Sequence, residues 1–181
     1  MHREIEQYVI RDWRIDDAPS IARYANNRKI WMNLRDAFPH PYRLHDAESF
    51  ISSTLQADPI TVYAIATRSE AIGSIGLILG KDVHRFTAEI GYWLAEPFWG
   101  KGITTEAVKS LTAFAIHDLK MQRVFAEPFT TNPASARVLE KAGYLREGIL
   151  RSGAFKDGKV LDLFLYSYVA GPTPTPGVGF A

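Results

Sequence analysis

The stretch AEIGYWLAEPFWGKGITTEAV, residues 88–108, carries the pattern on which the fold assignment depends. Its first part, 88–94, is an apolar run typical of a strand, and the part from Gly102 onward has helical spacing. Between them, Gly100 and Gly102 contribute no side-chain packing and cost backbone entropy. We therefore expect these glycines to serve a function that needs uncovered backbone.

The loop between this strand and helix has the features of a phosphate cradle. Backbone N–H groups at a helix N-terminus lack intrahelical partners, and the helix dipole favours an anion there. Lys101 adds positive charge, and Thr104 and Thr105 add hydroxyls. The loop fits neither common nucleotide pattern: Ala95 replaces the first glycine of a Walker loop, and GKGITT lacks the third glycine of the dinucleotide fingerprint. A tight turn without a ligand is the alternative.

The composition predicts one domain and excludes several classes of protein. The 181 residues are 46% hydrophobic, enough for a core without disulfides, and the absence of cysteine fits a cytoplasmic protein. The net charge is +1, with no basic block, so we expect no nucleic-acid partner. No apolar run reaches the roughly 20 residues that span a bilayer. We expect no metal site, because the histidines lack ligand spacing: His2, His40, His45, His84 and His117.

Periodicity and turn residues predict helices mixed with strands. Asp16 is the expected N-cap of the first helix, and Gly143 is expected to end the helix that Asn132 opens. The predicted helices cover 16–27, 45–55, 102–119 and 132–142, and the predicted strands cover 8–13, 60–67, 71–79, 87–94, 123–129, 144–152 and 160–169. This order predicts an α/β (α+β) domain over residues 6–170. A Pro/Gly-rich, flexible tail is expected over 171–181.

Three runs together resemble the GCN5-related N-acetyltransferases (GNAT), and within them the RimJ/RimL-like branch. They are residues 88–116, NPASARVLEKAGYLREG at 132–148, and FPHPYRLHDAESFI at 38–51. The resemblance implies the acyl-CoA N-acyltransferase fold. That fold is a mixed, mostly antiparallel sheet of about seven strands flanked by about four helices, splayed at a central parallel pair.

The resemblance also implies acetyl-CoA as co-substrate and an amine as acceptor. The pyrophosphate of coenzyme A is then expected on the backbone of Trp99, Gly100, Lys101, Gly102, Ile103, Thr104 and Thr105. The pantetheine arm is expected beside Tyr92, Trp93, Leu94, Asn132 and Ser135. A backbone N–H near residues 92–94 is the expected oxyanion donor.

Two side chains are candidates for proton transfer. Glu89 is the expected base, since an apolar strand should raise the pKa of its carboxyl; the alternative is a solvent-facing or salt-bridged residue. Leu139 stands where many relatives have a tyrosine acid, so Ser135 is the replacement we expect. The alternative for Ser135 is a first-turn serine that binds a backbone amide.

The acceptor is expected to be a protein N-terminal amine or a small-molecule amine. Its expected lining is Trp31, Asn33, Phe38, Tyr42 and Phe155, with membership of the core as the alternative for the aromatic residues. The expected assembly is a monomer or homodimer. The rival functions are a non-catalytic acyl-CoA-binding module on the same fold and, more distantly, a nucleotide-binding protein.

Overall fold

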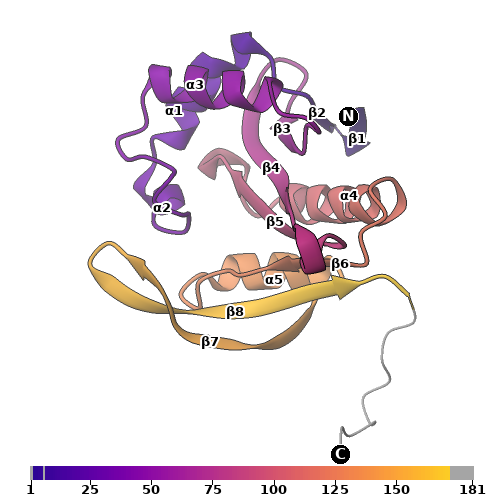
Figure 1. Cartoon of the computed structure of the whole chain (residues 1–181). Helices are drawn as coiled ribbons and strands as arrows, with labels where there is room; N and C mark the ends of the chain where they lie inside the picture. The colour runs from indigo at the N-terminus through magenta and orange to yellow at the C-terminus, as the bar shows by residue number, and fades with distance from the viewer. Residues whose placement is uncertain (1, 6, 172–181) are drawn as a thin grey trace, which may run out of the picture.

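The computed structural model describes residues 2–5 and 7–171 and contains one eight-stranded sheet (Figure 1). The strand order is β1-β2-β3-β4-β5-β6-β8-β7; β5 and β6 run parallel and the other neighbouring strands antiparallel. The strands are β1 His2–Ile5, β2 Tyr8–Arg11, β3 Val62–Ala66, β4 Ala71–Leu79, β5 Thr87–Leu94, β6 Arg123–Ala126, β7 Leu145–Lys156 and β8 Lys159–Val169. The tail predicted over 171–181 lies outside the described residues, except for its first glycine.

Five α-helices accompany the sheet in the described part of the chain. In Figure 1, α1 to α3 lie above the opening in the sheet, and α4 and α5 lie to the right and below. Their bounds are α1 Ala18–Ala25, α2 Arg28–Trp31, α3 Leu44–Leu55, α4 Ile103–His117 and α5 Pro133–Lys141.

The predicted mixed, mostly antiparallel sheet with one parallel pair is confirmed, and β4 and β5 have the predicted bounds. One strand and one helix were not predicted. The four residues of β1 are mostly exposed and charged, so they show no alternation, and α2 is a single turn, too short for a helical period. The turns predicted on either side of β4 do form antiparallel hairpins.

Two hydrophobic clusters lie on opposite faces of the central strands. Tyr63 and Ile65 of β3 belong to the cluster beneath α4 and α5, whereas Ala64 between them belongs to the cluster beneath α1 and α3. This follows from the strand geometry, in which successive side chains point to opposite faces. The sheet is therefore covered on both faces around β3, β4 and β5.

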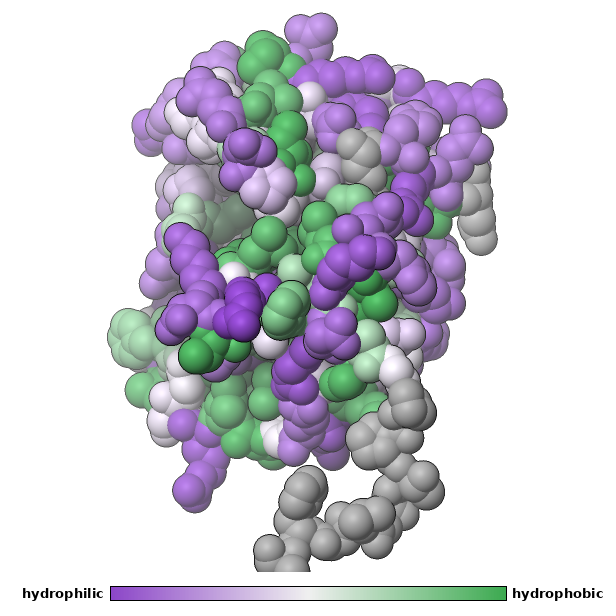
Figure 2. Space-filling model, turned by 45° about the vertical axis from the view of Figure 1, so that its right-hand side comes forward, coloured by the Kyte–Doolittle hydropathy of each residue, from purple (hydrophilic) through white to green (hydrophobic). Residues whose placement is uncertain are grey.

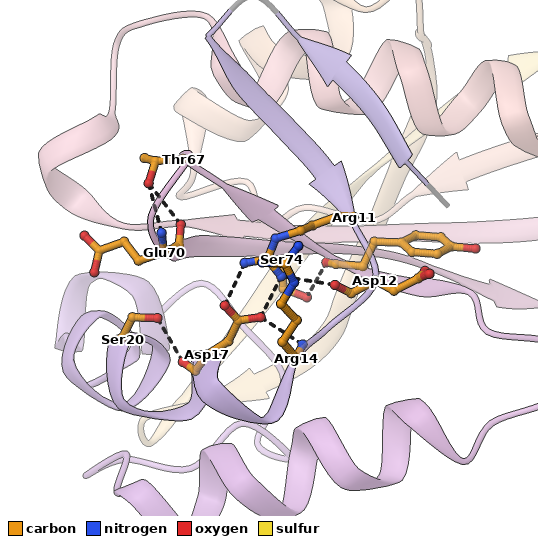
Figure 3. A network of polar contacts seen from close by, with 9 residues as sticks. Arg11, Asp12, Arg14, Asp17, Ser20, Thr67, Glu70 and Ser74 are labelled. Carbon is orange, nitrogen blue, oxygen red and sulfur yellow. Dashed lines mark hydrogen bonds and ion pairs between the residues drawn. The ribbon is translucent and has the colours of Figure 1, made fainter.

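The turn before α1 is fixed by a buried ion pair (Figure 3). Both guanidinium nitrogens Nη1 and Nη2 of Arg11 donate to the carboxylate of Asp17 at 2.7 Å, and the Arg14 backbone N–H donates to the same carboxylate at 2.9 Å. The predicted N-cap at Asp16 is wrong. The N-cap position belongs to Asp17, whose side chain does not cap the helix, because its carboxylate accepts from Arg11 and from the Arg14 backbone N–H.

The outer strands expose apolar side chains. Figure 2 shows green surface in the lower part of the molecule, where β7 and β8 lie in Figure 1. The exposed residues there include Leu145, Ile149, Val160 and Val169. Edge strand β7 also carries charged side chains, which discourage pairing with a further strand.

The sheet opens between β5 and β6, and this opening positions the site. The parallel ladder covers three residue pairs, from Thr87↔Arg123 to Glu89↔Phe125. Beyond Glu89, β5 stays paired with β4 as far as Leu94, while the chain after β6 turns away. The edge of β5 that faces β6 is therefore free of strand pairing over residues 90–94.

Candidate active site

A groove of ≈ 940 Å³ lies at this opening. Both arms of the split sheet line it, together with the segment before α3, the start of α5 and the β7–β8 hairpin. The lining includes residues 33–38, 89–94, 126–129 and 153–156, and Trp99, Gly100, Thr104, Asn132 and Ser135. Most residues that the sequence indicated for donor, acceptor and proton transfer thus meet in one groove. Trp31, Lys101, Gly102, Ile103 and Thr105 do not line it.

The glycine loop leaves the N-terminus of α4 uncovered. Gly100 and Gly102 have φ values of +76° and +79°, and a Cβ added to either would meet nothing within 4 Å. Such φ values are costly for residues with a Cβ, which explains the glycines. Gly102 is the N-cap of α4, and no side chain caps this helix, so its first-turn N–H groups have no side-chain partner. This is the geometry of an anion site at a helix N-terminus.

The side chains around this loop have different roles. Trp99 donates its indole Nε1–H to the carbonyl of Leu94 at 2.6 Å, which ties the loop to the end of β5. Lys101 is exposed, with its ammonium 5.3 Å from the ring centre of Phe98. Ile103 and Thr105 are buried, so their side chains are not available to a ligand.

A hydroxyl pair connects β5 to α5. The Tyr92 hydroxyl lies 2.8 Å from Ser135 Oγ, and either oxygen is able to donate. Asn132 caps α5 by accepting a hydrogen bond from the Ser135 backbone N–H at 3.2 Å. The Ser135 hydroxyl therefore contacts another side chain in place of a backbone amide. Burial raises the pKa of Tyr92 well above its usual value, so this phenol stays protonated through neutral pH.

Glu89 lines the groove at the point where the sheet opens, but its surroundings are not apolar. Nη2 of Arg35 lies 2.6 Å from one carboxylate oxygen of Glu89 and 2.7 Å from the other. The salt-bridged alternative therefore describes the position of Glu89. Arg35 comes from the segment between α2 and α3, far from β5 in the sequence.

Glu127 is a second carboxylate in the groove and was not predicted from the sequence. It follows β6 directly, on the arm of the opening opposite Glu89. Burial raises the pKa of Glu127, and the nearby charge of Glu89 raises it further, while Arg35 opposes the shift. The available signal was an acidic residue at the end of a buried strand, directly before Pro128. Such a residue is typical of many strand ends, so it did not single out Glu127.

Three of the aromatic residues expected around the acceptor line the groove. Tyr42 lines it while lying buried in the cluster beneath α1 and α3, and burial raises its pKa to about 12. Phe38 packs against Tyr42 and Trp93, with ring centres 4.8 and 5.9 Å away, and lines the groove. Phe155 lines the groove from the β7–β8 hairpin and is exposed.

Trp31 and Asn33 have structural contacts. Trp31 stacks on His40, and the buried ammonium of Lys156 lies 3.8 Å from its ring centre. The same ammonium donates to Asp36 at 2.7 Å, which links the segment before α3 to the β7–β8 hairpin. Asn33 lines the groove and donates to the carbonyl of Lys29. Trp31 thus packs behind the residues that line the groove and does not line it itself.

Successive side chains of β5 point to opposite faces of the sheet and so divide the groove into two sides. Tyr92 packs with the cluster beneath α4 and α5, on the side of the glycine loop. Glu89, Gly91 and Trp93 point to the opposite side, where Trp93 packs with the cluster beneath α1 and α3. A Cβ added to Gly91 would meet nothing within 4 Å, so the groove is open over this residue. The two sides of the groove are joined at the gap between β5 and β6.

Two further findings concern the described residues 2–5 and 7–171. None of their helices is both long and apolar enough for a membrane crossing. They contain no group of three or more His, Cys, Asp or Glu side chains placed to bind a metal ion.

Comparison with known proteins identifies similar sequences and folds. Residues 7–145 match the family model described as an acetyltransferase (GNAT) domain. The Probable N-acetyltransferase YjcK of Bacillus subtilis is 46% identical over 114 residues, which cover 59% of this chain and 63% of YjcK. The ribosomal-protein-serine acetyltransferase of Escherichia coli is 30% identical over 108 residues, 60% of each chain. The matches thus span less than two thirds of these two relatives.

A solved structure supports the fold over nearly the whole chain. The microcin C7 self-immunity acetyltransferase MccE, in complex with acetyl-CoA and AMP, superposes with a TM-score of 0.78 at 23% identity. The superposition covers 91% of this chain and 93% of that one. At this identity, the likeness shows a common fold.

Proposed function

Because the chain belongs to the acetyltransferase (GNAT) domain family, we propose that it transfers an acetyl group from acetyl-CoA to the nitrogen of a primary amine. One observation carries the proposal. At the gap between β5 and β6, an uncovered helix N-terminus with a hydroxyl pair faces one side, and two carboxylates line the other. A donor and an acceptor approaching from opposite sides meet in that gap.

The glycine loop fits the pyrophosphate of coenzyme A. Open space over Gly100 and Gly102 lets a phosphate reach the backbone, and the first-turn N–H groups of α4 supply the donors. Thr104 and Asn132 line the groove nearby and would contact the bound co-substrate. Bound acetyl-CoA supplies the thioester carbonyl carbon that the amine attacks and the thiol that leaves. The unpaired edge of β5 over residues 92–94 offers backbone groups to the pantetheine amides and to the developing oxyanion.

The carboxylates and hydroxyls of the groove receive and pass on the protons that the acceptor loses in the reaction. A primary amine with a pKa of about 10.4 arrives as an ammonium ion and loses two protons in forming the amide. We assign the first proton to Glu127, because a base works best with a pKa shifted toward the operating pH. As the C–N bond forms and the C–S bond breaks, the second proton passes to the thiol through Tyr92 and Ser135. Glu89 holds the ammonium beside Glu127.

The raised pKa of Tyr92 restricts its role. A thiol has a pKa of about 8.5, far below that of a buried phenol, so complete transfer of the phenolic proton to the thiolate is unfavourable. Tyr92 therefore acts by donating a hydrogen bond and by passing a proton as it receives one. The same argument applies to Ser135, whose hydroxyl is a still weaker acid.

The proposal is tested with the purified full chain, acetyl-CoA and a panel of amines and N-terminal peptides, with thiol release as the readout. Turnover of at least one amine is the expected result. Tight acetyl-CoA binding without turnover of any amine would favour the non-catalytic module. Preference for ATP or NAD over acetyl-CoA in competitive binding would favour a nucleotide-binding protein. The panel also separates peptide amines from small-molecule amines as acceptors.

Replacing Tyr92 by Phe is expected to lower kcat about 10²-fold, the usual loss when one donor to a developing charge is removed. Ser135→Ala should cost less, because the phenol remains able to donate. The matched control is Tyr144→Phe, which removes a buried hydroxyl bonded to Thr112 at 2.7 Å, outside the groove. That variant should lose stability and keep kcat. Steady-state kinetics that show equal kcat for Tyr92→Phe and the native chain would contradict the role of the phenol.

Replacing Gly91 by Val is expected to block the acceptor side without harming the fold. The added Cβ meets open space, and valine favours strands, so the free energy of unfolding should be unchanged or higher. In the complex, the valine side chain would compete with the bound amine for the same space. Such overpacking costs about 1–3 kcal/mol, so kcat/KM for the amine should fall about 5- to 150-fold. Gly148→Val on β7 is the control, since its Cβ also meets nothing and it does not line the groove. Equal kcat/KM for the two variants would mean that no substrate passes over Gly91.

A further inference from the structure

The guanidinium of Arg35 contacts Glu89 in a way that differs from a structural arginine pair of this protein. One nitrogen, Nη2, contacts both carboxylate oxygens of Glu89, at 2.6 and 2.7 Å. In the Arg11–Asp17 pair, each of two nitrogens contacts its own oxygen, which is the fork geometry that arginine adopts with carboxylates. A single nitrogen between two carboxylate oxygens is a contact that a primary ammonium makes equally well.

The Arg35 side chain is free to leave this position. It is 64% exposed, whereas the Glu89 side chain is 19% exposed. Its backbone is held independently, because its carbonyl accepts from the Phe38 N–H and the next residue, Asp36, pairs with the buried Lys156. Exposed ion pairs contribute up to about 1 kcal/mol, so a ligand of the same charge is able to displace the guanidinium at small cost.

A second carboxylate lies near this ion pair. Glu127 lines the same groove, and its pKa responds to the charges of both Glu89 and Arg35. When Arg35 leaves, the space between Glu89 and Glu127 has two acidic neighbours and no positive charge from that side chain. An ammonium ion that enters there regains the Coulomb energy that was lost with Arg35, whereas a neutral molecule does not.

We propose that Arg35 occupies the position of the acceptor's ammonium group in the free protein, and that the acceptor binds by displacing this guanidinium from Glu89. The inference rests on the proposed amine acetylation and specifies its acceptor class. The acceptor is an amine that is protonated in solution, held between Glu89 and Glu127. Arg35 is then a specificity-determining residue, because amines that are neutral in solution gain nothing from taking its place.

The kinetic test compares Arg35→Gln with the native chain on benzylamine, which is protonated at neutral pH, and on aniline, which is not. Removing the competing guanidinium should lower KM for benzylamine by up to about fivefold, from an ion pair of up to 1 kcal/mol, with kcat nearly unchanged. KM for aniline should not fall. Arg23→Gln is the matched control, since Arg23 also forms an exposed ion pair, with Glu70, and does not line the groove.

Added methylguanidinium separates competition from positioning. At constant chloride concentration, it should inhibit Arg35→Gln competitively with benzylamine, with an inhibition constant up to about fivefold lower than for the native chain, in which Arg35 competes for the position. Stronger inhibition of the native chain than of Arg35→Gln would overturn the proposal. If Arg35→Gln loses kcat and methylguanidinium restores it, the guanidinium assists the reaction by positioning Glu89 and is not displaced.

A binding readout separates this inference from the acetyl-transfer proposal. The Nε–H resonance of Arg35 in the full chain, assigned by its loss in Arg35→Gln, should shift when benzylamine is added and stay unchanged with aniline. The Arg23 resonance should respond to neither compound. A shift without any turnover would leave the ammonium site standing and remove the proposed activity. Turnover of benzylamine without a shift would remove the displacement and leave the activity.

Discussion

Glutamine in place of Glu127 is expected to lower kcat about 10²- to 10⁴-fold, the range that a positioned base contributes. Glutamine keeps the shape of the side chain and cannot accept the proton of the acceptor. Acetyl-CoA binding should be nearly unchanged, because Glu127 lies on the arm of the opening opposite β5, away from the glycine loop. Steady-state kinetics at saturating amine, together with direct binding of acetyl-CoA, measure the two effects separately.

The pH profile of the native chain gives an independent check on Glu127. Only the carboxylate accepts a proton, so kcat/KM, which reports the groups of the free protein, should fall as the pH falls through the raised pKa of this group. The acidic limb should therefore lie above the ordinary glutamate value of about 4.3. The limb should be absent from the residual activity of Glu127→Gln.

Matched variants decide between the two carboxylates. Glu89→Gln should mainly raise KM for the amine, since we assign Glu89 to binding the ammonium. Glu147→Gln removes a carboxylate paired with Arg123 outside the groove and should leave kcat unchanged. If Glu89→Gln shows the large loss of kcat and Glu127→Gln does not, Glu89 is the base, as the sequence alone suggested.

The second large effect concerns stability: Asp17→Asn is expected to lower the free energy of unfolding by about 3–5 kcal/mol. The side chains of Arg11 and Asp17 are only 8% and 6% exposed, and Figure 3 shows the carboxylate between Arg11 and the Arg14 backbone. Removing one charge leaves the other buried without compensation. This loss is a large fraction of the 5–15 kcal/mol typical of whole proteins, and urea denaturation at neutral pH measures it.

Two controls test whether burial is the cause of this loss. Arg23→Gln removes one partner of the exposed pair with Glu70 and should cost at most about 1 kcal/mol. The double variant Arg11→Met/Asp17→Leu replaces both charges by apolar groups and should recover much of the stability lost in Asp17→Asn. A loss below about 1 kcal/mol in Asp17→Asn would show that the ion pair is not worth more than a surface pair.

Local patterns predicted the elements around the site. The apolar, strand-like runs at 71–79 and 87–94, with short turns around them, predicted the bounds of β4 and β5, because these signals are local to each segment. Gly100 and Gly102 indicated an uncovered backbone, and the structure explains them through positive φ angles at the start of α4. Asn132 indicated the start of α5 and does cap it.

Contacts between distant segments decided the chemistry of the groove. Arg35 and Glu89 are 54 residues apart, so no local pattern places a guanidinium on that carboxylate. Tyr92 and Ser135 were both predicted beside pantetheine, but their 2.8 Å contact depends on the tertiary fold, which brings the start of α5 to β5. The position of Glu127 depends on the opening of the sheet, where it is partly buried and lies close enough to Glu89 for that charge to raise its pKa.

The sequence by itself determined the order of most strands and helices along the chain, the glycine loop at the start of α4 and the family to which the chain belongs. These features follow from short-range periodicity, capping and backbone freedom, which a segment carries within itself. Only the tertiary structure decided which charges face one another, and so which carboxylate is the better candidate base. Charges act through space, and the fold alone brings Arg35 into contact with Glu89 and places Glu127 where both charges act on it.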